Sequence, residues 1–261
     1  MARGKGDRLP IERRSEVLRL VRRRGVATVS EVVAGTGVSA STVRRDLRAL
    51  DAQGLVRLSH GGAAAVEGTT FEPLFRERER RNPQEKGRIA AEALEFLEPG
   101  QSVIFDSSST VLAVIEALKQ RPVRLSAVTN DVSAAAMLSE IEGVSVVVPG
   151  GQVREGSFTL LGSYTREFFL RLHADLLLLG MHAISGGLMS DASLEVVEIK
   201  QAMIEGARRT VLLADREKFG SPAFFEVGEV GLVDDLITGS GTPVEALEPI
   251  RAETETRIHL V

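Results

Sequence analysis

The chain has 261 residues and no cysteine, which excludes disulfides, zinc–thiolate sites and cysteine nucleophiles. Its formal net charge of −4 hides an asymmetry, because residues 1–60 carry a formal +7 and residues 61–261 a formal −11. A basic head on an acidic body is the charge distribution expected when the amino-terminal part binds a polyanion. With 10 Phe, 1 Tyr and no Trp, few rings can stack on single-stranded bases, so duplex DNA is the favoured polyanion.

Compartment and size follow from the same composition. No apolar run approaches the ~20 residues that a membrane-spanning helix needs, and the first residues lack the pattern of a signal peptide. We therefore expect a cytoplasmic protein with no membrane contact, for which the absence of cysteine is also typical. The length predicts one or two domains with ample residues for a hydrophobic core.

The first predicted helix begins at Pro10 and ends at Arg24, before Gly25. Its apolar residues are expected to pack beneath a later, DNA-reading helix, and they are Ile11, Val17, Leu18 and Val21. The arginines at 22–24 end this helix. They can face the negative end of the helix dipole or contact phosphate, and both roles stay open.

A helix-turn-helix is predicted over about residues 27–46. Ser30 is expected to cap a short apolar helix, and residues 35–37, Gly-Thr-Gly, supply a tight turn. Ser39 then caps a second helix that begins near Ala40.

The second helix has the side chains of a DNA-reading helix. Its apolar residues recur at helical spacing, at Val43, Leu47 and Leu50, and predict one buried stripe. An arginine-rich outer face is about as often mere solvated surface, but the preceding helix and turn favour DNA contact. A β-hairpin wing is predicted between Gly54 and Ala63. The predicted DNA-binding residues are Ser39, Ser41, Thr42, Arg44, Arg45, Arg48, Arg57 and His60.

This amino-terminal pattern resembles the signature of the DeoR family of bacterial transcription regulators. The matching positions keep their spacing without a gap, at 38–39, 42–47, 50, 54, 56–57 and 60–63. In that family a winged helix-turn-helix precedes a domain that senses a phosphorylated sugar or a related metabolite. The resemblance therefore implies a sensor domain in the rest of the chain.

Small residues followed by mixed charges over 66–81 predict a linker. We accordingly predict a DNA-binding domain at 8–65 and an effector-sensing domain at 82–261. The opening of the family's sensor domain is similar to this chain at Glu72, Phe75, Arg78, Glu85, Lys86, Ile89 and Ala90.

Strand-like and helical runs alternate after a helix that is expected to begin with Asn82 as its cap and Pro83 in its first turn. The runs occupy residues 103–105, 111–118, 125–128, 132–141 and 144–148. Such βαβα alternation predicts a parallel sheet covered on both faces. A buried strand from Asp175 to Gly180 and a closing strand near 256–260 are expected to extend it.

Three loops are candidates for the effector site, because ligands of open α/β sheets bind beyond the carboxyl ends of the strands. The loop from Asp106 to Thr110 follows a strand and opens a helix, which suits an anion, although an ordinary Ser/Thr helix cap is the alternative. The other two loops contain Thr129-Asn130 and Gly150-Gly151. The family usually carries glycine where this chain has Ser108.

The resemblance extends the candidate site. The family's Asn/Asp position after the buried strand corresponds to His182, and its Leu-Ala-Asp-x-x-Lys-Phe-Gly segment matches 213–220. Lys200 or Lys218 is expected to pair with a phosphate, the alternative being an ordinary Glu–Lys pair. The predicted effector-binding residues are Asp106, Ser107, Ser108, Ser109, Thr110, Thr129, Asn130, Gly150, Gly151, His182, Lys200, Asp215 and Lys218.

These features predict a repressor of carbohydrate-metabolism genes whose operator binding is modulated by a phosphorylated sugar. The expected fold is a small α+β winged helix-turn-helix domain followed by an α/β sensor domain, which the resemblance likens to the ribose-phosphate isomerase and CoA-transferase folds. No cofactor or metal is expected, since the four histidines share no ligand spacing. A homodimer or homotetramer is expected, because one helix-turn-helix reads only a few base pairs.

Two alternatives remain at this point. An isomerase-like enzyme would use Asp106, Glu195, Lys200 or Asp215 for proton transfer, but it has no evident use for a basic helix-turn-helix head. We therefore predict no catalytic residue. A ligand-independent architectural DNA binder is disfavoured by the long α/β domain with its anion-suited loops.

Overall fold

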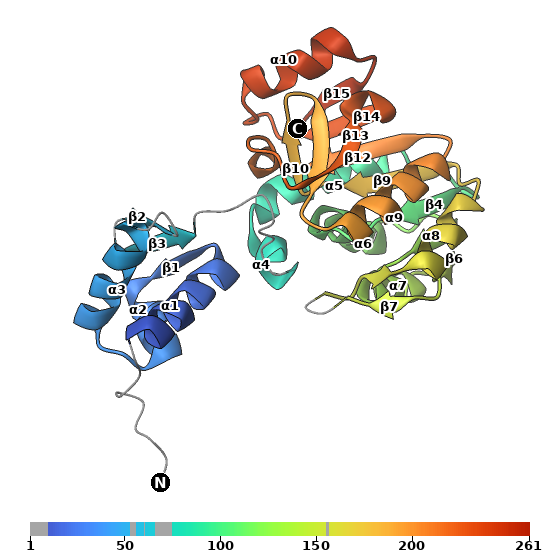
Figure 1. Cartoon of the computed structure of the whole chain (residues 1–261). Coiled ribbons are helices and arrows are strands. Elements are labelled where there is room, and N and C mark those ends of the chain that lie inside the picture. The colour runs from blue at the N-terminus through green and yellow to red at the C-terminus, as the bar shows by residue number, and fades with distance from the viewer. Residues whose placement is uncertain (1–9, 53–55, 60, 66–74, 155–156) are drawn as a thin grey trace. The chain divides into compact units, whose positions relative to one another are not determined.

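The computed structural model describes residues 10–52, 56–59, 61–65, 75–154 and 157–261. The chain divides into two compact units, an amino-terminal unit that ends at Glu77 and a carboxyl-terminal unit that begins at Arg78 (Figure 1). A short helix, α4 (Phe75–Arg80), spans this division and lies within the segment predicted as a linker. Among the described residues, no helix is long and apolar enough to cross a membrane.

The amino-terminal unit packs three helices with a small antiparallel sheet (Figure 1). Its helices are α1 (Pro10–Arg24), α2 (Val29–Thr36) and α3 (Ala40–Ala52), and its strands are β1 (Val26–Thr28), β2 (Val56–Ser59) and β3 (Gly62–Ala65), in the order β1-β3-β2. The predicted winged helix-turn-helix is confirmed, with β2 and β3 as the wing. Strand β1 was not predicted, because three residues between two helices carry no readable period.

The start of α2 differs from the prediction. Thr28, not Ser30, is the cap: the amide of Glu31 donates to Thr28 Oγ1, and the amide of Thr28 donates to Glu31 Oε2 at 2.8 Å. This reciprocal pair satisfies two amides that a helix start leaves without partners. The bonds that the Thr28 amide and hydroxyl donate to the Glu31 carboxylate lower the pKa of Glu31 below its usual value.

The turn between α2 and α3 begins later than predicted. Residues 35 and 36 still belong to α2, and the chain reverses at Gly37, whose φ of 70° lies in the left-handed region that glycine adopts freely. Helix α3 begins at Ala40 as predicted, and the amide of Thr42 donates to Ser39 Oγ at 3.4 Å. The predicted cap of the second helix is thus confirmed.

A buried ion pair fastens α1 to α3. The apolar stripe of α3, which is Val43, Leu47 and Leu50, is buried as predicted and packs with Val17 and Val21 of α1. Beside it, Asp46 is 1% exposed and accepts from Arg13 Nε at 2.6 Å and from Arg13 Nη2 at 3.1 Å. The hydrogen bond to Asp46 raises the pKa of Arg13. The orientation of α3 therefore depends on a carboxylate that the sequence analysis did not single out.

The carboxyl-terminal unit is built on a seven-stranded sheet in which every pair is parallel, as predicted. From one edge to the other the strands are β15 (Arg257–Leu260), β14 (Asp235–Thr238), β12 (Thr210–Ala214), β9 (Leu176–Gly180), β4 (Ser102–Phe105), β5 (Leu125–Thr129) and β6 (Val144–Val147). The central strand β9 is buried along its whole length, which explains its unbroken apolar run.

Helices cover this sheet on both faces. They are α5 (Pro83–Leu94), α6 (Ser109–Gln120), α7 (Val132–Ser139), α8 (Ser163–Leu170), α9 (Leu194–Glu205) and α10 (Val244–Glu253). Helix α6 packs between α5 and α7, while α8 packs on α9. The strands run outward from β4 in one direction and from β9 in the other, so right-handed connections put the two groups of helices on opposite faces. The strand order therefore reverses between β4 and β9.

Smaller elements complete the unit. A second, antiparallel sheet contains β10 (Ala183–Ser185), β11 (Leu188–Asp191) and β13 (Phe225–Glu229), and a hairpin joins β7 (Gln152–Val153) to β8 (Leu160–Leu161). Two short 3-10 helices, η1 (Arg216–Lys218) and η2 (Val230–Leu232), follow β12 and β13. The sequence analysis predicted neither the small sheet nor the hairpin, since these strands are too short to show a period.

Candidate DNA-binding and effector sites

The outer face of α3 carries the predicted DNA-binding side chains. Arg44, Arg45 and Arg48 are exposed, and among the described residues none of the three forms an ion pair with a carboxylate. Their guanidinium groups are thus available for phosphate oxygens or base edges. At the start of the same helix, Ser39 Oγ lies 3.1 Å from Ser41 Oγ and 3.0 Å from Thr42 Oγ1.

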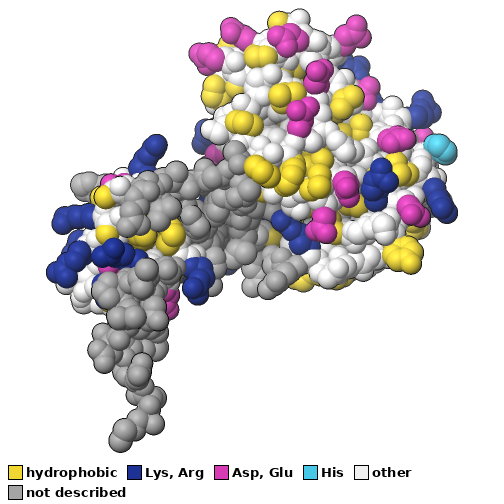
Figure 2. Space-filling view, viewed as in Figure 1, with side chains coloured by type: hydrophobic (Ala, Val, Ile, Leu, Met, Phe, Trp, Pro, Cys, Tyr) yellow, Lys and Arg dark blue, Asp and Glu magenta, His cyan; other side chains and the backbone are white. Residues whose placement is uncertain are grey.

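The wing contributes less that can be described. Arg57 lies exposed on β2, whereas His60 lies outside the described residues. Lys and Arg side chains gather on the described part of the amino-terminal unit, and acidic side chains are numerous on the visible face of the other unit (Figure 2). The surface therefore shows the charge asymmetry that the sequence predicts.

The reversal of strand order between β4 and β9 holds a buried ion pair. Lys200 on α9 donates to Asp106 Oδ2 at 2.6 Å and to the carbonyl of Gly180 at 2.8 Å. The amide of Gly180 donates to the same carboxylate oxygen at 3.0 Å. Both charged side chains are about 95% or more buried. Ligands of open α/β sheets bind at such a reversal point, so this pair marks the floor of the candidate site.

The loop after β4 follows an ordinary backbone path. Ser108 has φ −147° and ψ 144°, which any residue adopts, and its Oγ accepts from the amides of Thr110 and Val111. Glycine is instead required at Gly180, because a Cβ there would lie 2.1 Å from Ser108 Oγ. The serine that replaces the family's glycine thus caps α6 and occupies the space next to β9.

A hydroxyl and carboxylate network joins this loop to the next one. Ser107 Oγ donates to Asp131 Oδ2 at 2.7 Å and lies 2.7 Å from Thr159 Oγ1. Asp131 also caps α7 by accepting from the amides of Ser133 and Ala134. The sequence analysis missed Asp131 and Thr159, although an Asp directly before a helical run is a readable cap.

The second predicted loop is buried beneath β8. Asn130 Nδ2 donates to the carbonyl of Leu160 at 3.2 Å, and the amide of Leu160 donates to the carbonyl of Asn130 at 2.7 Å. The other side-chain atom, Asn130 Oδ1, is buried with no hydrogen-bond partner in the described structure. A buried acceptor without a partner is costly, which is typical of a position completed by a ligand or a water molecule.

The third loop and His182 lie at the same edge of the sheet, and the described hydrogen bond of the third loop goes to α8. Thr165 Oγ1 donates to the carbonyl of Gly150 at 2.8 Å, and a Cβ on Gly151 would lie 2.3 Å from Thr165 Oγ1. His182 is partly buried directly after β9. The structure therefore joins the first two predicted loops closely and the third only through its position.

The last predicted residues, Asp215 and Lys218, follow β12 and meet the start of α5. Asn82 was predicted as the cap of α5, but its side chain makes no cap hydrogen bond, and its Nδ2 donates to Asp215 Oδ1 at 3.0 Å. Lys86, on the next turn of α5, donates to the backbone carbonyl of Arg78. Lys86 was not predicted as a site residue, because its family match suggested no role and its neighbours in space come from distant segments.

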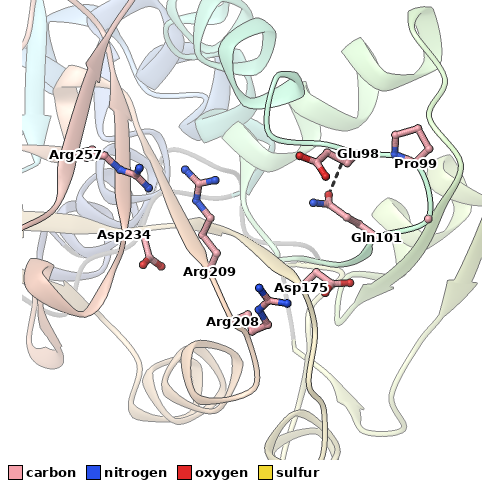
Figure 3. A pocket seen from close by; sticks show the side chains of 9 residues that line it. Glu98, Pro99, Gln101, Asp175, Arg208, Arg209, Asp234 and Arg257 are labelled. Atoms are coloured by element: carbon pink, nitrogen blue, oxygen red, sulfur yellow. Dashed lines mark hydrogen bonds between the residues drawn. The ribbon is translucent and has the colours of Figure 1, made fainter.

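A cavity of about 650 Å³ lies at the opposite edge, where the strands begin (Figure 3). Glu98, Pro99, Gly100, Gln101, Asp175, Arg208, Arg209, Asp234 and Arg257 line it. Arg209 and Arg257 both donate hydrogen bonds to Asp235. Burial acts to raise the pKa of Asp235, but the hydrogen bonds from His259 and Arg209 hold that pKa below its usual value. These two arginines are already paired with Asp235, and the cavity lies at the edge opposite to the predicted anion site.

The family models match both units. Residues 13–69 match the DeoR-like helix-turn-helix domain and residues 81–240 match the DeoR C terminal sensor domain. The chain is 31% identical over 238 residues to the glycerol-3-phosphate regulon repressor of Escherichia coli (strain K12), covering 91% of this chain and 94% of that protein. It is 30% identical over 244 residues to a putative aga operon transcriptional repressor of Escherichia coli O157:H7, covering 92% and 90%.

Solved structures match the chain only at low similarity. Ribose 5 phosphate isomerase A from Neisseria gonorrhoeae is 18% identical with a TM-score of 0.39 and covers 52% of this chain and 53% of its own. A tetrameric eIF2B-beta2-delta2 complex from C. thermophilum is 14% identical with a TM-score of 0.44, and the match covers 88% of this chain and 90% of that chain. Similarity at this level carries no functional argument. The family models and the regulator relatives identify the function: the chain is a transcriptional regulator rather than an enzyme, and it belongs to the DeoR family.

Proposed function

We propose that the chain is a repressor of carbohydrate-metabolism genes. Its affinity for the operator would change when a phosphorylated sugar or polyol binds at the carboxyl edge of its parallel sheet. Residues 8–65 would read the DNA and residues 82–261 would bind the effector, in the cytoplasm. Relatives named as repressors of the aga operon and of the glycerol-3-phosphate regulon support this class of target.

One observation carries the effector proposal. The residues next to the strand reversal form a polar floor inside a largely apolar core, with Asp106 and Lys200 paired and Asn130 Oδ1 left without a partner. Hydroxyl-rich ligands need such fixed acceptors and donors for orientation. The Ser107–Asp131–Thr159 network lies beside them and offers further hydroxyl groups.

For Lys200 we propose a role other than the phosphate contact predicted from the sequence. Its ammonium already has two close protein acceptors, Asp106 Oδ2 and the carbonyl of Gly180. We therefore propose that Lys200 holds Asp106 and the end of β9 in place, so that Asp106 is oriented for an effector hydroxyl. This makes Lys200 a positioning residue.

The test is operator binding with and without effector. A thermal-shift panel of sugar and polyol phosphates that includes glycerol 3-phosphate comes first, since a ligand at about 100 times its Kd adds about 2.7 kcal/mol of stability. Fluorescence anisotropy with DNA from upstream of the chain's own gene then measures affinity with each hit. A protein whose DNA affinity changes with no member of the panel, or changes equally with the dephosphorylated sugars, would contradict the proposal.

We further propose a homodimer or homotetramer, because a single recognition helix covers too few base pairs for useful specificity. Exposed apolar side chains of the carboxyl-terminal unit, such as Phe224, Leu194 and Leu188, support self-association there. Light scattering of the full chain is expected to give two or four copies. A monomer with full operator affinity would contradict this assembly.

A further inference from the structure

A second cluster of charged residues lies at the carboxyl edge, away from the Asp106–Lys200 pair. Lys86 comes from α5 and Lys218 from η1, and Asp215 lies between these elements, held by Asn82 at 3.0 Å. The amide of Arg216 donates to Glu85 Oε1 at 2.8 Å, which fixes η1 against α5. The start of α5 and the loop after β12 therefore form one rigid corner that presents two lysines.

The ammonium groups of this corner have few partners. Lys86 is only 3% exposed, yet the only acceptor for its three N–H groups among the described residues is the neutral carbonyl of Arg78. Lys218 is partly buried, and its ammonium makes no hydrogen bond or ion pair with a described residue. Lys200, by contrast, has both a carboxylate and a carbonyl. The corner therefore has N–H donors without acceptors and positive charge without a paired carboxylate among the described residues.

Nearby charges agree with this description. The pKa of Lys86 is lowered to about 8, mainly by burial; Lys218 and Arg78 contribute to the decrease, and Asp215 and Glu217 oppose it. Burial likewise lowers the pKa of Lys218, where Asp215 and Asp191 oppose Arg78 and Arg81. Two partly uncompensated lysines that repel each other are stabilised by an anion placed between them.

We propose that Lys86 and Lys218 bind the phosphate group of the effector as a pair, and that Lys86 is a binding residue of this site. The inference rests on the proposed function and names the part of the site that takes the anion. Lys218, which is partly exposed, gives the anion access, and Lys86 lies behind it. A tetrahedral dianion has enough acceptor oxygens for the free N–H groups of both side chains.

Sulfate is the sharpest probe, because it stays a dianion where the lysines titrate. Calorimetric titration of the full-length protein with sulfate and with inorganic phosphate compares the parent with Lys86→Met and Lys218→Met. We expect each substitution to weaken both anions about tenfold or more. Lys119→Met is the matched control, since Lys119 pairs with Glu140 on the surface and should leave anion affinity unchanged.

The pH dependence separates Lys86 from a general loss of charge. The parent's sulfate affinity should fall between about pH 7 and about pH 9.5 as Lys86 loses its proton. Lys86→Arg keeps its charge over this range, so it should retain sulfate binding and lose most of the pH dependence. The parent alone supplies this readout if Lys86→Met does not fold.

The outcomes distinguish this inference from the proposed function. If Lys86→Met and Lys218→Met bind sulfate like the parent, or if the parent binds neither anion, the lysine pair is not the anion site. If both variants still release DNA when the sugar phosphate that acts on the parent protein is added, the proposed repressor function is supported and this inference is wrong. If the parent responds to no sugar phosphate but binds sulfate through these lysines, the proposed effector class is wrong and the anion site stands.

Discussion

The two units place their charged side chains in opposite ways. On α3 of the amino-terminal unit, Arg44, Arg45 and Arg48 are exposed, and the only buried charge on that helix, Asp46, is held by Arg13. In the carboxyl-terminal unit, the Asp106–Lys200 pair is buried at the centre of the sheet. The candidate contact surface of the first unit is thus an open helix face, whereas the candidate site of the second is part of the core.

This difference has an energetic consequence. Removing an exposed arginine changes what the surface binds and leaves folding nearly untouched, since surface substitutions usually alter stability by about 0.5 kcal/mol or less. Removing one partner of a buried ion pair leaves a charge in a low-dielectric interior, so folding and function change together. Substitutions in the two units should therefore separate binding from stability to very different degrees.

The largest effect is expected at the buried pair. Lys200→Met should lower the free energy of unfolding by about 3–5 kcal/mol, because Asp106 would keep only the amide of Gly180 as a partner. Denaturant unfolding measures this change. Lys119→Met is the control, because its ion pair with Glu140, whose side chain is mostly exposed, should contribute about 1 kcal/mol or less. Equal stabilities of the two variants would abolish the contrast between the units.

A pH experiment tests the second buried lysine. The pKa of Lys86 is about 8 in the folded protein, below its ordinary value near about 10.4, so between these values the unfolded chain binds a proton that the folded chain lacks. Stability should therefore rise with pH across this window, by roughly 3 kcal/mol at most. Lys86→Met should show a flatter curve than the parent, and parallel curves would contradict the assignment.

An effect on binding without one on stability is expected for the recognition helix. Arg44→Ala and Arg45→Ala should each weaken operator binding by about 1–3 kcal/mol if the arginine reads a base, or lower the salt slope by about 1 if it contacts phosphate. Anisotropy titrations on operator and random DNA at several salt concentrations distinguish these roles. Arg171→Ala, an exposed arginine on the other unit, serves as the control. Unchanged DNA affinity in both α3 variants would mean that this helix does not bind in a DNA groove.

The smallest expected effect concerns the cap of α2. Thr28→Ala removes the side chain that accepts from Glu31 and should destabilise the amino-terminal unit by about 1 kcal/mol. Ser30→Ala lies two residues away in the first turn and should change stability by less than about 0.5 kcal/mol. Thermal unfolding of both variants compares them directly. A larger loss in Ser30→Ala would mean that the cap stands where the sequence first suggested.

Local patterns were sufficient for most of the amino-terminal unit. The apolar spacing of Val43, Leu47 and Leu50 and the cap at Ser39 predicted α3 to the residue at its start, because capping and periodicity act within a few residues. The choice of Thr28 over Ser30 was missed, since both are capping residues and only the path of β1 decides which one precedes the helix.

By itself the sequence determined the main helices and strands of both units, the parallel sheet and the basic helix α3, since each follows from periodicity, composition or the alternation of strands and helices. It also predicts the edge at which a ligand would bind, from the direction of the strands. Only the tertiary structure decided the partners of the lysines. Lys200 meets Asp106, 94 positions away, whereas Lys86 and Lys218 come together without a carboxylate for each. The reason is physical: a lysine looks the same in sequence whether its charge is neutralised or free, and contacts between distant segments determine which it is.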